Sequence, residues 1–355
     1  MIKQIKLQNI RVFPNNTFEF DPGVNLVIGP NGAGKTTILE AITFFAFGKF
    51  FSVSPDSMAV SDTESVGRLE VLTDKGKASV AITPKEKIAK VYDNKIPNSQ
   101  LIGFEKAVLF NPETVELICA SPDVRRREID LIIAQNNPNF VIETLQYRKV
   151  LKQRNSLLKT IAAKRAGEEE LEFWDSQLRE LSLKIVGERK AFLDEINGSI
   201  SQIHGKFSSR KGELKIIYRD SADYDRFQEA LQAMRESDIA GGSTSIGPHR
   251  DDFYFEFNGR SLRDHASRGE QRLAALALKL EEVEYLSAPD CQPLLVLDDV
   301  FSELDEGRRT ALTGGLRDKK NQIIISATDD QMIPESLKQN AHLINLSTAK
   351  EPDEW

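Results

Sequence analysis

Residues 29–36, Gly-Pro-Asn-Gly-Ala-Gly-Lys-Thr, constrain the fold of this 355-residue chain more than any other segment. They match the pattern G-x-x-x-x-G-K-[S/T] and lie between a predicted strand at 24–28 and a predicted helix at 37–47. Glycines allow positive φ angles and close backbone approach, so successive N–H groups and the helix start can point at phosphate oxygens. The segment predicts a phosphate-binding loop rather than a chance glycine-rich turn.

Two side chains of this loop carry its chemistry. We expect the ammonium of Lys35 to hold the β- and γ-phosphates of a nucleotide, as a catalytic residue, and the hydroxyl of Thr36 to bind Mg²⁺, which prefers oxygen ligands. The loop alone does not identify the nucleotide. The residues expected to contact it are Gly29, Pro30, Asn31, Gly32, Ala33, Gly34, Lys35, Thr36 and Thr37.

A second acidic segment follows a short apolar run. Leu294 to Leu297 are four apolar residues, and Asp298 and Asp299 come directly after them. This pattern predicts a buried parallel strand whose carboxyl end, where open α/β sheets bind ligands, carries two carboxylates. We expect Asp298 to reach the Mg²⁺ and Asp299 to orient or deprotonate the attacking water as a catalytic residue. The alternative is a buried strand that ends in a polar turn.

The segment 266–272, Ala-Ser-Arg-Gly-Glu-Gln-Arg, begins a predicted helix that runs to Leu286. Alone, it is typical of an ordinary helix capped by Ser267. However, Ser-x-Gly-Glu lies 31 positions before Asp298, and this order resembles the signature motif of ABC-type ATPases. Residues 302–305, Ser-Glu-Leu-Asp, then stand where that superfamily has its D-loop. The resemblance implies ATP as the nucleotide and an ATP-dependent homodimer, in which Ser267 and Gly269 of one subunit contact the γ-phosphate bound by the other.

Composition excludes several other classes of protein. The net charge is −7, so any site for a polyanion must be local. The two cysteines lie 172 positions apart, which argues against a disulfide framework and a cysteine-rich zinc site and favours a reducing cytoplasm. The apolar run 41–47 is much shorter than the ~20 residues that cross a bilayer. Lysines interrupt the apolar residues of 1–7, which therefore predict a strand rather than a signal peptide.

The periodicity of the chain predicts a discontinuous domain. Residues 1–110 alternate with period two, residues from about 122 to 203 are mostly helical, and strands return after 213. We therefore predict an α/β fold that combines a mixed β lobe with a parallel sheet. The resemblance to ABC-type ATPases implies that residues 1–110 and 240–355 form an ATPase head of that type. An inserted, mainly helical arm occupies 111–239, with breaks near 136–138 and 166–167 and an antiparallel helical pair.

The two long helices of this insertion differ in charge. Residues 141–165 carry a net charge of +6, whereas residues 166–198 carry −5. Pairing between the two helices is one interpretation. The other is a stripe that faces DNA phosphates, formed by residues such as Lys149, Lys152 and Arg154.

The distance between the motifs indicates which branch of the superfamily the chain resembles. Lys35 and Ser267 are 232 positions apart, more than in transporter ATPase subunits and much less than in SMC-type proteins with their long coiled coils. Across nearly the whole chain the sequence resembles the RecF family. The resemblance rests on residues 9–11 (Asn-Ile-Arg), 111–113 (Asn-Pro-Glu), 121–130 (Ser-Pro-Asp-Val-Arg-Arg-Arg-Glu-Ile-Asp), 151–155 (Leu-Lys-Gln-Arg-Asn), 247–252 (Gly-Pro-His-Arg-Asp-Asp) and 267–272.

The RecF resemblance implies a protein of recombinational repair and replication-gap repair. ATP and Mg²⁺ would close a homodimer that binds duplex or gapped DNA mainly through phosphates, and slow, DNA-stimulated hydrolysis would release it. RecR and RecO are the implied partners, through which the recombinase is loaded, and no membrane is involved. Two alternatives are a soluble ABC ATPase subunit of another machine and a nuclease-type P-loop ATPase. The helical insertion argues against the first, and the lack of length for a further metal-binding domain argues against the second.

Two further sites depend on this resemblance. Arg11 is implied to reach the nucleotide phosphates, and the alternative is a surface charge at a strand end. His249 and Arg250 have Asp251 and Asp252 as immediate neighbours, which favours a structural pairing, and neither receives a catalytic role. No switch histidine follows the predicted strand at 322–326, so the γ-phosphate sensor is not identified. Because Asp299 stands where transporter-like relatives have a glutamate, we expect slow hydrolysis.

Overall fold

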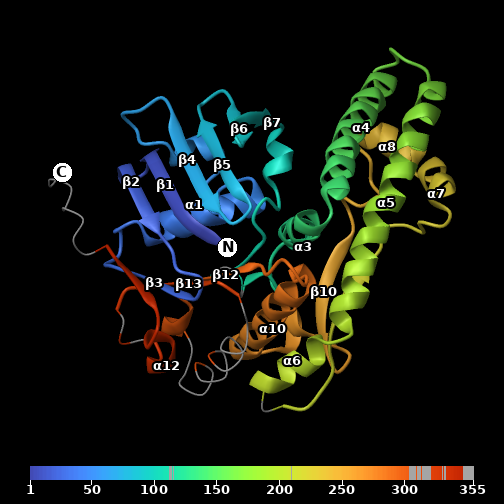
Figure 1. Cartoon of the computed structure of the whole chain (residues 1–355). Coiled ribbons are helices and arrows are strands. Elements are labelled where there is room, and N and C mark those ends of the chain that lie inside the picture. The colour runs from blue at the N-terminus through green and yellow to red at the C-terminus, as the bar shows by residue number, and fades with distance from the viewer. Residues whose placement is uncertain are drawn as a thin grey trace. The chain divides into compact units, whose positions relative to one another are not determined.

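The computed structural model describes residues 1–111, 114, 116–208, 210–303, 309, 313, 321–329, 331 and 333–346 (Figure 1). The chain packs as two compact units. Unit 1 comprises Met1–Val115, Ile203–Ser209 and Ala275–Trp355, and unit 2 comprises Glu116–Gln202 and Arg210–Ala274. Residues 240–274, which the sequence places with the ATPase head, therefore pack with the helical residues of unit 2. The functional division into a head and an arm stays a prediction.

Unit 1 contains an antiparallel and a parallel sheet. The antiparallel sheet has the order β2-β1-β4-β5-β6-β7 and the bounds β1 (Ile2–Ile10), β2 (Phe13–Glu19), β4 (Gly67–Thr73), β5 (Gly76–Ile82), β6 (Lys87–Val91) and β7 (Asn94–Ile96). The parallel sheet has the order β14-β3-β13-β12-β8 and the bounds β3 (Val24–Ile28), β8 (Ala107–Phe110), β12 (Leu294–Asp298), β13 (Ile323–Ala327) and β14 (His342–Asn345). The mixed α/β fold with a parallel sheet agrees with the fold class predicted from the sequence.

Helix α1 (Lys35–Phe47) packs between these two sheets, since it contacts β1 and β4 of the first and β8, β12 and β13 of the second. A helix covered on both sides needs an apolar surface all round, and only Thr36 of its thirteen residues is not buried. This explains why the sequence of α1 lacks a polar face. Short helices complete the unit: η1 (Asp56–Ala59), η2 (Asn98–Leu101), η4 (Val300–Glu303) and α12 (Glu335–Lys338).

The register of the parallel sheet places three strand ends together. Strand β13 lies between β3 and β12, and Ala327 of β13 pairs with Ile28, the last residue before the phosphate-binding loop. Ser326 of the same strand pairs with Asp298 at the end of β12. The loop and the acidic strand end therefore meet at the carboxyl edge of one sheet, as the sequence predicted.

Unit 2 combines a small antiparallel sheet with long helices. The sheet has the order β11-β10-β9, with β9 (Leu214–Arg219), β10 (Asp252–Phe257) and β11 (Arg260–Ser261). The helices are α3 (Pro122–Asn136), α4 (Pro138–Ala162), η3 (Glu168–Glu170), α5 (Leu171–Asn197), α6 (Ile200–Phe207), α7 (Phe227–Ala233), α8 (Arg235–Gly241), α9 (Leu262–His265) and α10 (Arg268–Leu286), of which α6 and α10 continue into unit 1. Helices α4 and α5 lie side by side and form the expected antiparallel pair (Figure 1).

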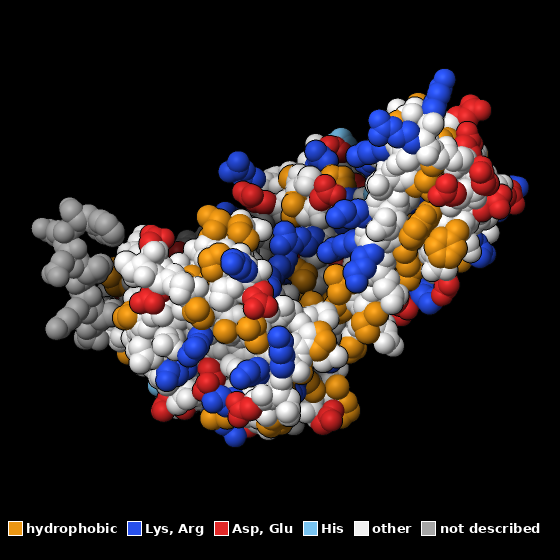
Figure 2. Space-filling model, turned by 90° about the horizontal axis from the view of Figure 1, so that it is seen from above, with side chains coloured by type: hydrophobic (Ala, Val, Ile, Leu, Met, Phe, Trp, Pro, Cys, Tyr) orange, Lys and Arg blue, Asp and Glu red, His pale blue; other side chains and the backbone are white. Residues whose placement is uncertain are grey.

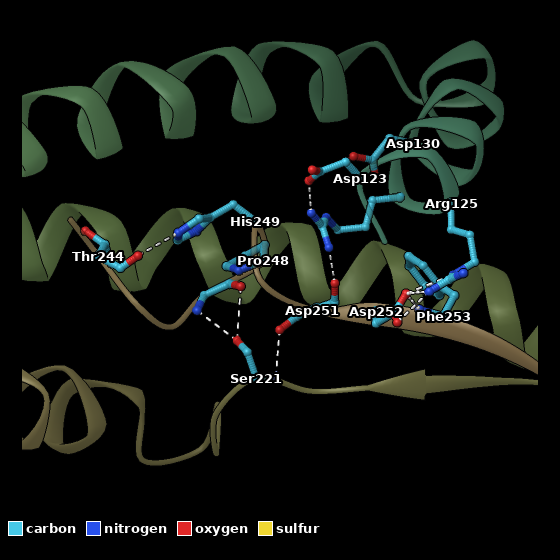
Figure 3. Close-up of polar contacts among 12 residues, drawn as sticks. Asp123, Arg125, Asp130, Ser221, Thr244, Pro248, His249, Asp251, Asp252 and Phe253 are labelled. Atoms are coloured by element: carbon cyan, nitrogen blue, oxygen red, sulfur yellow. Dashed lines mark hydrogen bonds and ion pairs between the residues drawn. The ribbon is translucent and has the colours of Figure 1, made fainter. Parts of the chain in front are cut away.

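Ion pairs join the helices of unit 2 to one another and to its sheet (Figure 3). Arg125 of α3 donates two hydrogen bonds of 2.8 and 2.7 Å from Nη2 to the carboxylate of Asp252 on β10, and Arg189 of α5 donates to Asp130 at 2.8 and 2.9 Å.

The expectation that His249 pairs with the aspartates beside it is wrong. Its ring nitrogens contact the hydroxyl of Tyr147 at 2.6 Å and the carbonyl of Thr244 at 3.1 Å.

The interpretation that Arg154 of α4 faces DNA phosphates is also wrong. Its side chain is 0% exposed and pairs with two buried carboxylates, Asp175 of α5 at 2.7 Å and Asp238 of α8 at 2.8 Å. A buried cation is stable only with such partners. Arg154 therefore joins three helices and belongs to no DNA-facing surface.

Candidate nucleotide-binding site

The phosphate-binding loop leaves the start of α1 open to an anion. Gly32 and Gly34 have φ angles of 84° and 97°, a region that glycine adopts without strain. A Cβ atom at Gly34 would lie 2.5 Å from Cζ of Phe13 and 2.8 Å from Cγ2 of Val12, so glycine is also required by space. Gly34 caps α1 without a side-chain hydrogen bond, and no acidic residue lies in the first turn. The N–H groups and the positive end of the helix dipole therefore remain available for phosphate.

The side chain of Lys35 folds back over this loop. Its ammonium donates hydrogen bonds of 2.8 Å to the carbonyl of Gly29 and 3.1 Å to that of Pro30. Burial lowers the pKa of Lys35, and the nearby carboxylates of Asp299 and Asp298 oppose this shift. The loop thus holds a cation at its centre.

Asp298 lies at the end of β12 between two hydroxyl groups. Ser326 donates a 2.5 Å hydrogen bond to Oδ1, and Thr36 donates a 3.3 Å hydrogen bond to Oδ2. Burial raises the pKa of Asp298, the two hydroxyl donors lower it, and the charge of Asp299 raises it further. The oxygen atoms of Thr36 and Asp298 are hard ligands on one side of the loop, so they fit Mg²⁺, which binds few protein ligands and takes the rest from water and phosphate. Among the described residues no group of three or more His, Cys, Asp or Glu side chains forms another metal site.

Asp299 follows in a strained backbone conformation. Its φ angle is 54°, which is uncommon for a residue other than glycine, and its N–H donates to the hydroxyl of Ser326 at 3.1 Å. Ser326 thereby fixes both aspartates. Its hydroxyl accepts a hydrogen bond from the N–H of Asp299 and donates one to the carboxylate of Asp298. Sequence reasoning missed this role, although a serine within the apolar run 323–327 was a usable signal.

Arg11 reaches the first turn of α1 from the turn after β1. Its guanidinium lies 2.6 Å from the carboxylate of Glu40, which is 0% exposed, and 3.4 Å from the hydroxyl of Thr37. Glu40 also accepts from the backbone N–H groups of Phe51 and Ser52 at 3.1 and 2.8 Å. Arg11 is therefore more than a surface charge at a strand end, because a buried carboxylate orients it beside the loop. Contact with the phosphates stays a prediction.

The start of α10 in unit 2 is closed by its own side chains. Ser267 donates to Oε2 of Glu270 from both its N–H, at 2.7 Å, and its hydroxyl, at 2.9 Å. Arg210 pairs with the same carboxylate. Ser267 is exposed and Gly269 is half-buried. Their contact with a nucleotide stays a prediction, and Leu304, Asp305, Pro112 and Glu113 of the other predicted motifs lie outside the described residues.

Comparisons with known proteins agree with this geometry. The family described as an AAA domain matches residues 4–287. The DNA replication and repair protein RecF of Geobacillus thermodenitrificans (strain NG80-2) is 36% identical to this chain and covers 97% of both sequences. That of Lachnoclostridium phytofermentans (strain ATCC 700394 / DSM 18823 / ISDg) is 37% identical and covers 88% of this chain and 89% of its own. This chain belongs to the RecF family.

Solved structures support the same assignment. A structure described as the recombination mediator protein RecF-ATP in the RecFOR pathway has a TM-score of 0.86 and 33% identity, with 92% of each chain covered. An Smc head bound to the C-winged helix domain of ScpA has a TM-score of 0.54 at 16% identity, covering 94% of this chain and 90% of its own. The second likeness shows that RecF shares its fold with SMC heads. No helix among the described residues of this RecF family member is long and apolar enough to cross a membrane.

Helix α4 presents a basic stripe, which we define as Arg148, Lys152 and Lys159. These residues are exposed and four and seven positions apart, so they share one helix face. Among the described residues none of the three has an ion-pair partner, so the predicted neutralisation by α5 does not occur at this stripe. Lys and Arg side chains gather along the helical unit in Figure 2.

Proposed function

We propose that this RecF family member is an ATP-binding DNA repair protein that closes into a homodimer with ATP and Mg²⁺ and then holds DNA. The observation that carries the proposal is the loop at the start of α1. Its uncapped helix end, the buried ammonium of Lys35 and the Thr36–Asp298 contact of 3.3 Å converge at one edge of the parallel sheet. No single one of these features selects a triphosphate with its metal. Together they match the negative charge of the phosphates and the positive charge of the metal ion.

Each residue of the site then has a distinct task. The N–H groups of residues 32–37 bind phosphate oxygens, and Lys35 moves from the carbonyls of Gly29 and Pro30 to the β- and γ-phosphates. Thr36 and Asp298 would hold Mg²⁺, which when bound would neutralise phosphate charge. Asp299 positions the attacking water, and Arg11 supports the first turn of α1. Hydrolysis by this arrangement is slow, because a short aspartate rather than a glutamate approaches the water.

The signature segment acts across the dimer rather than within one protomer. In the proposed dimer, Ser267 and Gly269 of one protomer contact the γ-phosphate held by the other. ATP stabilises the closed state by mass action, and hydrolysis removes that stabilisation. Phosphate contacts to the basic stripe hold duplex or gapped DNA. By analogy with structures described as belonging to the RecFOR pathway, the protein partners are RecR and RecO.

Sedimentation velocity with and without ATP and Mg²⁺ tests the proposal. We expect the natural protein to dimerise only with ATP. The variant Ser267→Arg should bind ATP with unchanged affinity yet remain monomeric, because the larger side chain blocks the trans contact. A matched control is Ser176→Arg, which adds the same charge at an exposed position of α5 and should dimerise normally. Equal oligomers in all samples, with or without nucleotide, would contradict the proposal.

A further inference from the structure

The carboxylate of Glu270 receives more donors than helix capping requires. In an ordinary capping box the glutamate accepts from the backbone N–H of the N-cap serine, while the serine hydroxyl accepts from the glutamate N–H. Here the second bond is long, at 3.3 Å, and the Ser267 hydroxyl instead donates to Oε2 of Glu270 at 2.9 Å. Arg210 also pairs with this carboxylate, through Oε1. Both donors of Ser267 and one arginine therefore converge on a single anion.

These are the groups that a γ-phosphate would require at the same place. The positive end of a helix dipole, a serine N–H, a serine hydroxyl and a guanidinium together form an anion site. The hydrogen bonds from Ser267 and the pairing with Arg210 lower the pKa of Glu270, so the carboxylate is ionised at neutral pH. A phosphate cannot take the donors of Ser267 while the carboxylate keeps them, and the two anions would repel each other at that distance.

We propose that Glu270 is an internal substitute for the γ-phosphate at the signature helix. Closure of the dimer exchanges one anion for the other: the carboxylate leaves Ser267, the phosphate of the facing protomer takes its place, and Arg210 compensates the charge in both states. This inference depends on the ATP-dependent dimer proposed above. It adds that Glu270 and Arg210 set how tightly that dimer forms. Because ADP has no γ-phosphate to displace the carboxylate, the open state is favoured after hydrolysis.

The exposure of this segment permits such an exchange. Ser267 and Arg268 are exposed, and the Arg210 side chain is 67% exposed, so an anion reaches the helix start without unfolding α10. Gln271 anchors the helix independently, since its side-chain amide donates to the carbonyl of Leu262 at 3.1 Å. Release of Glu270 therefore leaves the first turn of α10 attached to unit 2.

The dimer dissociation constant of Glu270→Gln in saturating ATP and Mg²⁺ tests this inference. Glutamine keeps the size and an acceptor for the helix cap but removes the competing charge. We expect dimerisation to tighten by about five- to thirtyfold, the range expected for one charge at a partly buried helix start. Glu270→Asp keeps the charge and should not tighten the dimer. Arg210→Gln should weaken it, since the cation that accompanies the phosphate is lost.

A matched control is Glu229→Gln on α7, which removes a glutamate that, like Glu270, is paired with an arginine, here Arg226 three residues away. It should leave the dimer constant unchanged. Thermal melting and ATP binding by the monomer verify that each variant is folded. If Glu270→Gln dimerises as tightly as the natural protein or more weakly, while the natural protein dimerises with ATP and Ser267→Arg does not, this inference is wrong and the proposed function stands. If the natural protein fails to dimerise with ATP, the proposed function itself fails.

Discussion

At the scale of single residues, the nucleotide site holds charges that the fold alone does not favour. Burial lowers the pKa of Lys35 and raises that of Asp298, so in both cases the protein disfavours the charged form. Such groups make the protein less stable until a ligand compensates them. The proposed binding of a phosphate and a metal at this edge would therefore relieve a destabilisation that is already present, which is a usual feature of functional sites.

Asp298→Asn should stabilise the protein in the absence of nucleotide. Because the folded-state pKa of Asp298 is raised above 3.8, the folded protein holds this proton more tightly than the unfolded chain does. The resulting destabilisation is absent below pH 3.8, grows as pH rises toward the raised pKa and is complete above it. Urea denaturation of both proteins should therefore show a higher free energy of unfolding for Asp298→Asn at pH 7, a difference that shrinks as pH falls and is lost below pH 3.8.

Ser326→Ala is the matched control for this measurement. It deletes the 2.5 Å hydrogen bond to Asp298 and leaves the carboxylate buried with one donor fewer. We expect it to lower the free energy of unfolding by about 1 to 3 kcal/mol at pH 7, the opposite sign from Asp298→Asn. A loss of stability in both variants would show that Asp298 is a structural residue of the sheet edge.

At the scale of secondary-structure elements, the turn into α1 separates two requirements for glycine. Gly32 and Gly34 both have positive φ angles, but a Cβ atom at Gly32 would meet nothing within 4 Å, whereas one at Gly34 would overlap the ring of Phe13. Gly32→Ala should cost about 1 to 2 kcal/mol from backbone strain alone. Gly34→Ala should cost at least about 1 kcal/mol more, because Phe13 must move as well. Equal losses in urea denaturation would mean that Phe13 moves freely.

The elements with strong periodicity were the ones that the sequence predicted well. Strand β3 has the predicted bounds, and α1, α10 and the breaks between α3, α4 and α5 differ from expectation by few residues. The short elements β7, β11, α7 and α9 were not predicted, since two to seven residues carry too little pattern to distinguish them from turns. Strands β7 and β11 form local hairpins with β6 and β10, so the turn between each pair sets their positions.

The candidate site was predictable to the extent that it is local in sequence. Residues 29–36 and the end of β12 each form a continuous motif, so their chemistry is visible without a structure. The roles of Ser326 and Glu40 depend on pairing between strands and on a loop that folds back onto α1. Arg154 shows the same limit: in sequence it is one cation of a basic helix, and only the packing of α5 and α8 against α4 shows it to be buried.

At the scale of the whole molecule, a net charge of −7 has to be reconciled with the proposed binding to DNA. Long-range attraction does not favour the complex, so affinity must come from cations that are exposed and not already paired. The basic stripe on α4 meets this condition, with side chains about 6 and about 10 Å apart along the helix axis. Many other exposed lysines are already paired with acids and would have to exchange one anion for another.

The salt dependence of DNA binding distinguishes these two kinds of cation. Replacing Arg148, Lys152 and Lys159 together by Gln should weaken ATP-dependent DNA binding at every sequence. It should also reduce the slope of log K against log salt by up to about 2.7 per protomer, because each lost phosphate contact removes about 0.9. The control replaces Lys184, Lys190 and Lys215, which are paired with Glu180, Asp220 and Glu213. Both variants lose the same formal charge, so a general electrostatic effect would shift them equally, whereas direct phosphate contacts at the stripe change the slope of the first alone.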